Sequence, residues 1–344
     1  TTMTRGAVAA GNTVLSTSNN SRWDWTYMPS LLWRHDGAVW KAEAGAALAR
    51  AHHWRNEPRE GLFGSTTTQR TGLTVSFDDI FYLRPGAITV TDGTTGAPVD
   101  PFSLNNYAVT GATTGSDWTD DTRRSAYARM SRDFFGRIPL TVKAGLDFRQ
   151  AVRDAGGRSS ALTLAGPNNQ ALPFLDASFS TAEASFGFPR IQAVSSEKLY
   201  ASYLANPGAF TANANNEYRS AITLSKMARE LVSSAYLRGD VSLFQHRLKL
   251  IGGVRAEQTN ISAEGPLDDP TRNFQRRADG SPILGANGRP LPIASTALEI
   301  SRLTYIARGA KAEKEYLRLF PSLNANFNVR ENLVARAAVY TSVG

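Results

Sequence analysis

The chain has 344 residues, of which 42% are hydrophobic and 20% are charged. This composition is typical of a folded protein and excludes a largely disordered one. The chain contains no cysteine, which excludes disulfide frameworks and thiolate metal sites. Its net charge of +8 comes from lysines and arginines scattered along the chain. Without a basic block or a basic helix, this charge does not indicate a nucleic-acid partner.

Residues 1–20 are rich in Thr, Asn and Ser and are predicted to form a loop, with a frayed strand over residues 3–10 as the alternative. They lack the charged and apolar regions of a signal peptide. Elsewhere no window approaches the roughly 20 apolar residues that a membrane-spanning helix needs.

The first predicted hairpin covers residues 22–53. A period of two indicates an extended strand with one apolar face, and Asp36-Gly37 marks a tight turn between two such strands. The apolar positions of each strand share one parity: Trp23, Trp25, Tyr27, Leu31 and Trp33, then Trp40, Ala42, Ala44, Ala46 and Leu48.

A polar stretch over residues 54–121 is predicted to be a long loop. It contains one strand pair, over residues 73–83 and 87–91, which belongs either to the sheet or to a hairpin within the loop. The second hairpin follows at residues 122–153 and turns over residues 136–139. Its clearest strand alternates five apolar positions (Leu140, Val142, Ala144, Leu146 and Phe148) with Thr141, Lys143, Gly145, Asp147 and Arg149.

Two more hairpins are predicted at residues 226–263 and 313–342, after long loops over 155–221 and 260–312. The first of these loops contains a predicted helix over residues 195–205, which begins at Ser195 and ends before Pro207. In the last hairpin every odd position from Leu317 to Phe327 is apolar, and the even positions are polar except Phe320.

Tight turns near residues 36–37, 136–138, 244–247 and 329–332 alternate with excursions of tens of residues. Short turns on one rim and long loops on the other are typical of outer-membrane barrels, whereas soluble sandwiches distribute their turn lengths. Aromatic residues beside the short turns are typical of an interfacial girdle: Trp33, Trp40, Phe134, Phe135, Phe244 and Phe327. The prediction is an all-β chain in which residues 1–344 are part of one antiparallel, up-and-down transmembrane β-barrel. Its turns would be periplasmic and its long loops extracellular.

Four segments carry a resemblance to a known family: PLTVKAGLDFRQ (139–150), LVSSAYLRGDVSL (231–243), LKLIGGVRAEQT (248–259) and LRLFPSLNANFNVRENLVARAAVYTS (317–342). Together they resemble the barrel domain of TonB-dependent outer-membrane receptors, over roughly residues 20–344. The resemblance implies a 22-stranded barrel with an N-terminal plug and a short box that recruits the TonB complex. The chain shows no plug and no such box, and it stops before the last strands, so we expect a fragment of the barrel.

The resemblance also implies a place in the bacterial outer membrane, contact with its lipid, and energy-coupled uptake of a scarce nutrient. Siderophores, vitamins, metal complexes and oligosaccharides are the candidate ligands. The alternatives from other classes are a soluble or surface-anchored β-rich carbohydrate-binding protein and a passive porin. No nucleophile elbow, metalloprotease motif or phosphate-binding loop is present, so the chain is not expected to be an enzyme and no catalytic residue is proposed.

The candidate ligand-binding residues are charged residues of the predicted lumen and loops: Lys143, Asp147, Arg149, Arg153, Arg255 and Glu257. The four cations among them, Lys143, Arg149, Arg153 and Arg255, are predicted to lie toward the long-loop ends of their strands. These cations suit an anionic ligand such as a metal chelate with carboxylate or phosphate groups; the alternative is the general polarity of a hydrated lumen. Loop aromatics such as Trp54, Phe63 and Tyr200 either stack on a sugar or flat ligand or pack the loops together. His52 and His53 point to opposite sides of a strand, so no metal site is predicted there, and no cofactor is expected.

Overall fold

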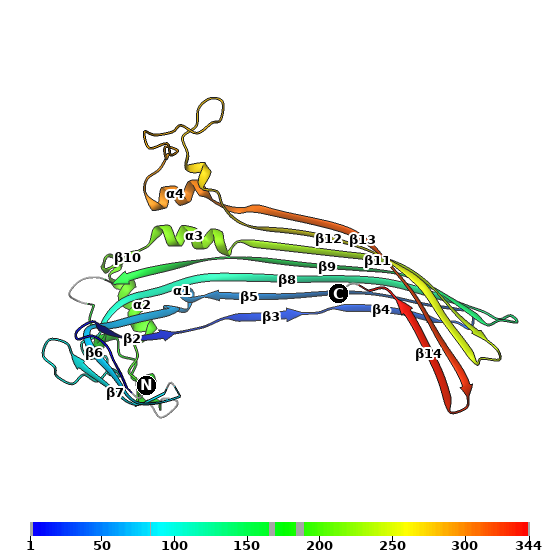
Figure 1. The fold of residues 1–344 in the computed structure, drawn as a ribbon, viewed down its shortest axis with the longest axis horizontal. Helices are drawn as coiled ribbons and strands as arrows, with labels where there is room; N and C mark the ends of the chain where they lie inside the picture. Colours follow the sequence, from blue (N-terminus) through cyan, green and yellow to red (C-terminus); the bar gives the residue numbers. More distant parts are fainter. Residues whose placement is uncertain (1–2, 83, 165–168, 184–188, 343–344) are drawn as a thin grey trace.

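The computed structural model describes residues 3–82, 84–164, 169–183 and 189–342. Its central feature is a set of long strands arranged as a wall (Figure 1). These strands are β3 (Trp23–Tyr27), β4 (Ser30–Asp36), β5 (Trp40–Asn56), β8 (Ala108–Phe134), β9 (Leu140–Leu164), β11 (Lys226–Leu243), β12 (Leu248–Asp268), β13 (Tyr305–Arg330) and β14 (Leu333–Tyr340).

Shorter elements gather at the end of the wall where the long loops lie (Figure 1). The strands there are β1 (Met3–Arg5), β2 (Gly11–Ser18), β6 (Ser65–Phe81), β7 (Arg84–Asp92) and β10 (Phe210–Ala212). The helices are α1 (Glu57–Glu60), α2 (Ser196–Ala205), α3 (Ala214–Leu224) and α4 (Ala297–Thr304). Among the residues described, no helix is long and apolar enough to cross a membrane.

All the strands belong to one 14-stranded sheet within the described residues. It runs from β1 through β6, β8, β9, β11, β12 and β13 to β14 without closing, and every pairing along it is antiparallel. β8 pairs along one edge with β5 near the short turns and with β6 near the long loops. The prediction of an antiparallel, partial barrel wall is therefore confirmed.

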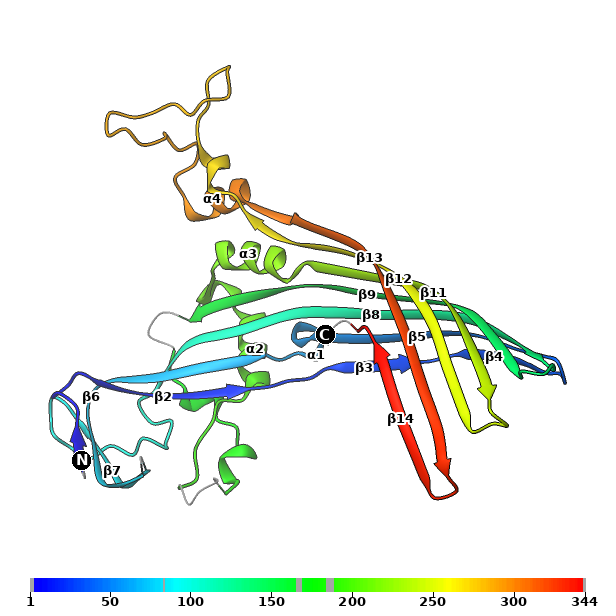
Figure 2. The same cartoon turned by 45° about the vertical axis from the view of Figure 1, so that its right-hand side comes forward.

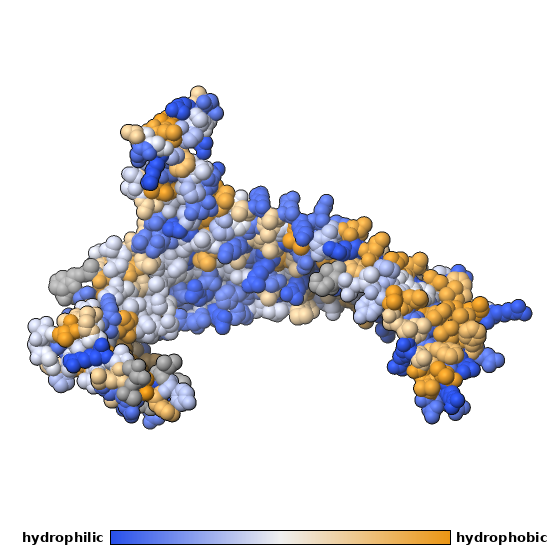
Figure 3. Space-filling model, viewed as in Figure 1, coloured by the Kyte–Doolittle hydropathy of each residue, from blue (hydrophilic) through white to orange (hydrophobic). Residues whose placement is uncertain are grey.

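The wall is curved, so its two faces are distinct. The hairpin of β13 and β14 comes round in front of β4 and β5, and the face inside this curl is concave (Figures 1 and 2). Polar residues meet on the concave face, where Glu43 pairs with Arg129 and Lys143 with Arg238. In Figure 3 the middle of the concave face is hydrophilic, whereas the curled hairpin, seen from its convex side, is largely hydrophobic.

The convex face carries an apolar band next to the short turns. It covers nine residues on β9, from Leu140 to Phe148, and eleven on β13, from Leu317 to Phe327. Its side chains are strongly exposed, as Leu146 (63%) shows. The band ends at a row of polar residues in register across neighbouring strands, here called the boundary row: Arg124, Gln150, Asn260 and Glu315, with Leu231 between them on β11.

Beyond the boundary row, the side chains that point to the convex face are buried under the long-loop segments. Ala112 of β8 and Leu162 of β9 pair with each other and are 4% and 5% exposed. They belong to a hydrophobic core that includes Phe63, Leu199 of α2 and Phe210 of β10. Here the chain covers its own apolar surface.

Local sequence signals explain the helices that form this cover. The Ser195 hydroxyl accepts a hydrogen bond from the Lys198 amide at 3.3 Å, which caps α2, and α2 ends at Asn206 before Pro207. The helix predicted over residues 195–205 is therefore confirmed. α3 is fastened to β9 by the Ser220 hydroxyl, which accepts from the Ser159 amide at 2.9 Å.

The strands are longer than their alternation predicts. β8 begins at Ala108 and β9 ends at Leu164, well inside the regions predicted as loops. The pattern fades there because the outer positions change from apolar to polar at the boundary row, while backbone pairing continues. The ambiguous strand pair forms the β6–β7 hairpin, in which β6 joins the main sheet through β8 and β7 pairs with β6. Residue 83, the last of that predicted run, lies outside the described residues.

Candidate ligand-contacting surface

A cleft of about 320 Å³ lies on the concave face at the short-turn end. We call it the charged cleft, because charged side chains of five neighbouring strands line it: Arg34, Asp36, Lys41, Glu43, Arg129, Lys143 and Arg238, together with Tyr236. The alternation of β4, β5, β8, β9 and β11 directs these side chains to one face.

Glu43 is the centre of the charged cleft. Its carboxylate accepts hydrogen bonds from the Tyr127 hydroxyl (2.6 Å), from Nη2 of Arg129 (2.6 Å) and from Nη2 of Arg34 (2.9 Å). Its side chain is only 10% exposed, whereas those of Arg34 and Arg129 are more than half exposed. Charge-assisted hydrogen bonds to one carboxylate therefore fix the positions of two accessible guanidinium groups.

The other cations of the charged cleft also have partners. Lys143 lies 3.3 Å from Asp240, which Arg238 contacts at 2.6 Å, and Lys41 lies 3.5 Å from Asp133. Five cations thus share three carboxylates, Glu43, Asp133 and Asp240. Because lysine and arginine present several donors each, unused N–H groups face the concave side. This arrangement suits transient contact with an anionic group.

Two tyrosine–glycine pairs lie in the wall beside the cleft. Tyr127 of β8 lies over Gly45 of β5, and Tyr236 of β11 lies over Gly145 of β9. A Cβ on Gly45 or Gly145 would lie only 2.6 Å or 2.5 Å from the tyrosine ring. Glycine at these positions is needed for the close approach of the ring to the backbone.

The six predicted ligand-binding residues lie on the concave face but do not converge on one site. Asp147 and Arg149 form an ion pair at 2.8 Å within β9, and Arg255 and Glu257 form one at 2.9 Å within β12. β11 separates the two pairs, since Ser234 is the register partner of both Asp147 and Glu257. Arg153 lies further along the same face of β9, opposite Asp121.

The predicted position of Lys143, Arg149 and Arg255 toward the long-loop ends is wrong. Lys143 is the fourth residue of β9 and lines the charged cleft near the short turns, and Arg149 and Arg255 lie well inside their strands. The error follows from strand length, because the strands continue past the residues where alternation stops. Contact of the six residues with a ligand stays a prediction.

Sequence reasoning missed the most connected residues of the cleft, Glu43 and Arg129. Both could have been found as candidates, since each is a charged residue at a strand position that alternates with apolar positions. The strand register that joins them, Glu43 to Arg129 across β5 and β8, brings together positions 86 residues apart. Alternation within one strand contains no information about that register.

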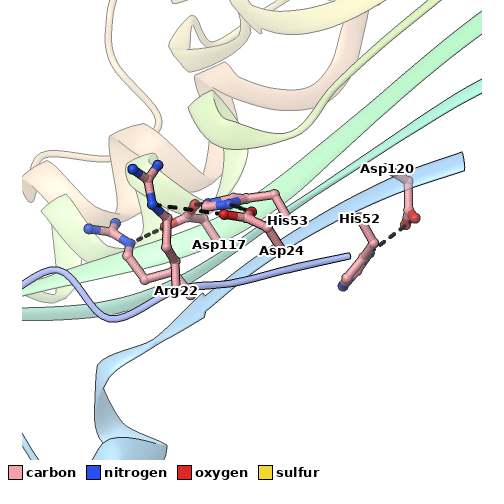
Figure 4. A network of polar contacts seen from close by, with 7 residues as sticks. Arg22, Asp24, His52, His53, Asp117 and Asp120 are labelled. Carbon is pink, nitrogen blue, oxygen red and sulfur yellow. Dashed lines mark hydrogen bonds and ion pairs between the residues drawn. The ribbon is translucent and has the colours of Figure 1, made fainter. Parts of the chain in front are cut away.

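A second polar network lies on the concave face beyond the boundary row. His53 Nδ1 lies 2.6 Å from Asp24, and its Nε2 lies 3.5 Å from Asp117. His52 turns to the convex face, where its Nδ1 lies 3.0 Å from Asp120 (Figure 4). The prediction that the two histidines point to opposite sides is confirmed. Among the residues described, no cluster of three or more His, Asp or Glu has the arrangement of a metal site.

The loop aromatics divide between two roles. Phe63, Tyr107 and Tyr200 are buried in the core that joins the long-loop segments, so they pack loops together. Trp54 instead lines a separate aromatic pocket on the convex face.

Comparison with known proteins gives weak likenesses. No protein-family model and no curated protein matches the chain. Among solved structures, the open form of the ferric-catecholate import receptor Fiu from E. coli K12 aligns with 96% of this chain and 53% of its own length, at 8% identity and a TM-score of 0.22. The closed form aligns with 93% of this chain and 48% of its own, at 9% identity and a TM-score of 0.20.

The chain thus spans about half the length of these receptors. TM-scores near 0.2 do not establish a shared fold. The functional assignment therefore rests on the surfaces of the molecule itself.

Proposed function

We propose that the chain forms part of the wall of a TonB-dependent receptor in the bacterial outer membrane. In this proposal the convex face contacts lipid, and the concave face lines a hydrated path for a scarce nutrient such as a siderophore, vitamin, metal complex or oligosaccharide. The role is transport, without a catalytic step. The TonB complex would act through a plug and box that the described residues do not contain.

The apolar band is the observation that carries the membrane part of the proposal. A transmembrane β-strand needs about 9–11 residues to cross the hydrocarbon core at a tilt of about 45°, and the band covers nine residues on β9 and eleven on β13. At one margin it ends at the boundary row. At the other margin Arg132 lies over the rings of Trp40 (5.0 Å) and Phe134 (4.7 Å), an aromatic and cationic rim of the kind found at membrane interfaces.

The exposed apolar surface is also too large for a protein surrounded by water. A shallow apolar depression of about 620 Å³ crosses β8, β9, β11 and β12, lined by residues such as Ala128, Leu146 and Ala235. Contiguous exposed apolar surface of this kind marks contact with lipid or with a partner protein. It argues against the soluble carbohydrate-binding alternative.

Partitioning tests the membrane assignment. The full chain should be recovered from cells in the outer-membrane fraction and should need detergent to stay in solution. Recovery in the aqueous fraction without detergent would refute the proposal and favour the soluble alternative.

The charged cleft supports the transport part, because it presents arginine and lysine donors on the concave side. Uptake by cells that carry the full-length receptor should depend on an intact TonB complex. Growth of a receptor deletion strain on candidate nutrients would identify the nutrient. Uptake that continues without TonB would instead favour a passive porin.

A further inference from the structure

An aromatic pocket lies on the convex face beyond the boundary row. It has a volume of about 300 Å³ and is lined by Trp23, Trp25, His52, Trp54, Arg59 and Glu60. The first four residues come from β3 and β5, where Trp23 pairs with Trp54 and Trp25 with His52. Arg59 and Glu60 come from α1, which follows β5 directly.

The pocket is held in shape by its own contacts. The Arg59 guanidinium lies 4.9 Å from the ring centre of Trp54, and Trp25 stacks on His52 at 5.4 Å. Nε1 of Trp23 donates to Glu60 at 3.4 Å. Trp23 and Trp25 remain 63% and 44% exposed. Exposed indoles held beside a carboxylate and a guanidinium form an amphipathic surface that is ready to bind without rearrangement.

This combination matches the chemistry of a pyranose ring. One side of such a ring is a patch of C–H groups that packs on an aromatic face, and its edge carries hydroxyl groups. Glu60 can accept hydrogen bonds from these hydroxyls and Arg59 can donate to them. The volume of 300 Å³ is at the small end of ligand pockets, which suits one ring.

Height above the membrane indicates the source of the sugar. Leu48 lies at the level of the boundary row, since it pairs with Arg124, and Trp54 lies six residues further along β5. At about 3.3 Å per residue and a tilt of about 45°, six residues correspond to about 14 Å. The polar headgroup layer of a typical leaflet is only about 5–8 Å deep. The pocket therefore lies above phospholipid headgroups and faces outward over the membrane.

We propose that this aromatic pocket binds a sugar ring in the headgroup of a glycolipid of the outer leaflet. The inference rests on the proposed function, because it requires the band below the pocket to be in lipid. Only a headgroup of several sugars reaches the height of Trp23 and Trp54. A tryptophan that anchors the chain at the membrane interface would instead lie at the boundary row. Tyr27 lies closer to that row than Trp23 does, since it pairs with Arg50.

The test uses the full chain in detergent micelles with three probes. These are lipopolysaccharide that retains its core oligosaccharide, lipid A without the core, and the free core oligosaccharide. Native mass spectrometry counts the bound molecules. Core-bearing lipopolysaccharide should bind, and lipid A and the free oligosaccharide should each bind more weakly by about 3- to 10-fold or more, as expected for losing one aromatic contact or the membrane anchor.

Variants locate the site. Trp23→Ala and Trp54→Ala should each weaken binding of core-bearing lipopolysaccharide about 3- to 10-fold. Trp23 is the safer variant for folding because it is 63% exposed. Trp33→Ala is the matched control, since Trp33 is a convex-face tryptophan beside a short turn with 56% exposure, and it should leave binding unchanged.

Three results would overturn the inference while leaving the membrane assignment intact. They are equal binding of lipid A and core-bearing lipopolysaccharide, equal binding of the free oligosaccharide, and binding that Trp23→Ala and Trp54→Ala leave unchanged. A chain that stays in solution without detergent would refute the proposed function itself.

Discussion

The two ends of the convex face use the same strands and the same parity, yet differ in what covers their apolar side chains. Next to the short turns, Leu146 and Leu317 are 63% and 64% exposed. Beyond the boundary row, Leu162 and Leu164 are 5% and 8% exposed, in a core with Leu199 of α2 and Phe210 of β10. Burying a leucine side chain is worth about 1.5–3 kcal/mol. The chain gains this from its own loops at one end only.

Because its side chains stay exposed, the apolar band needs a partner from outside the described residues. A face that the chain could cover with loops, as it does at the other end, is left open over about ten residues of each strand, the span of a hydrocarbon core. The concave face differs less along its length, since it carries ion pairs in the charged cleft and also beside His53, where Arg55 pairs with Asp117. The contrast between covered and open convex surface is therefore the most direct signature of the proposed membrane.

The largest effect is expected where the convex face is covered. Phe63 is fully buried in the loop core, so Phe63→Ala should lower the free energy of unfolding by about 3–5 kcal/mol. Urea unfolding of the detergent-solubilised protein measures this, and hydrogen exchange should show the loss in β10 and α2. Phe135→Ala is the control, since Phe135 is 79% exposed and should cost far less. Equal losses in the two variants would contradict the existence of a separate loop core.

Charge on the open convex face is expected to have the next largest effect. Leu323→Arg should make folding into lipid less favourable by about 2–4 kcal/mol, the cost of an arginine on the lipid face near the bilayer midplane. Asn324→Arg, on the concave face of the same strand, should cost little because water reaches it. Folding of both variants into vesicles, followed by the gel shift of the folded form, gives the comparison. Similar costs at the two positions would remove the distinction between the faces.

A smaller effect is expected at the wall itself, beside the charged cleft. Gly145→Ala would place a Cβ 2.5 Å from the ring of Tyr236, and such overpacking costs about 1–3 kcal/mol. Gly239→Ala is the matched control on the neighbouring strand, where the nearest atom, from Leu140, would be 3.9 Å away. Thermal unfolding should separate the two variants. An unchanged unfolding temperature in Gly145→Ala would mean that the ring of Tyr236 moves aside at no cost.

The smallest effect concerns the β6–β7 hairpin, which lies among the long-loop elements. The pKa of Asp92 is held below its ordinary value of 3.8 by hydrogen bonds from the Thr95 and Thr94 amides and the Thr95 hydroxyl. Because the folded pKa is depressed, this contribution to stability is complete above the unfolded pKa. It is lost as the pH falls through the folded value.

Hydrogen exchange of residues 65–92 between neutral and strongly acid pH measures this loss. Asp92→Asn should remove the pH dependence that Asp92 supplies, while leaving the apolar band unaffected. An unchanged pH dependence in that variant would assign the acid sensitivity to other carboxylates.

Local signals allowed much of the architecture to be predicted. The alternation in β13, the turn between β13 and β14 and the capped helix α2 are each encoded within a few consecutive residues. Strand alternation and helix caps depend only on residues that are close in the chain, so they can be recognised in the sequence alone. The parity that places Lys143 and Arg255 on the polar side was predicted in the same way.

Which residues share a face thus follows from the amino-acid sequence alone, because side-chain direction in a strand depends only on position. The charges that meet at Glu43, the lengths of β8 and β9, and the apolar residues that the loops cover all depend on how distant segments pack in three dimensions. So does the pocket that Trp23, Trp54 and Arg59 form, since they come from three elements. These outcomes depend on strand register and on contacts between distant segments, for which the alternation of a single strand carries no signal.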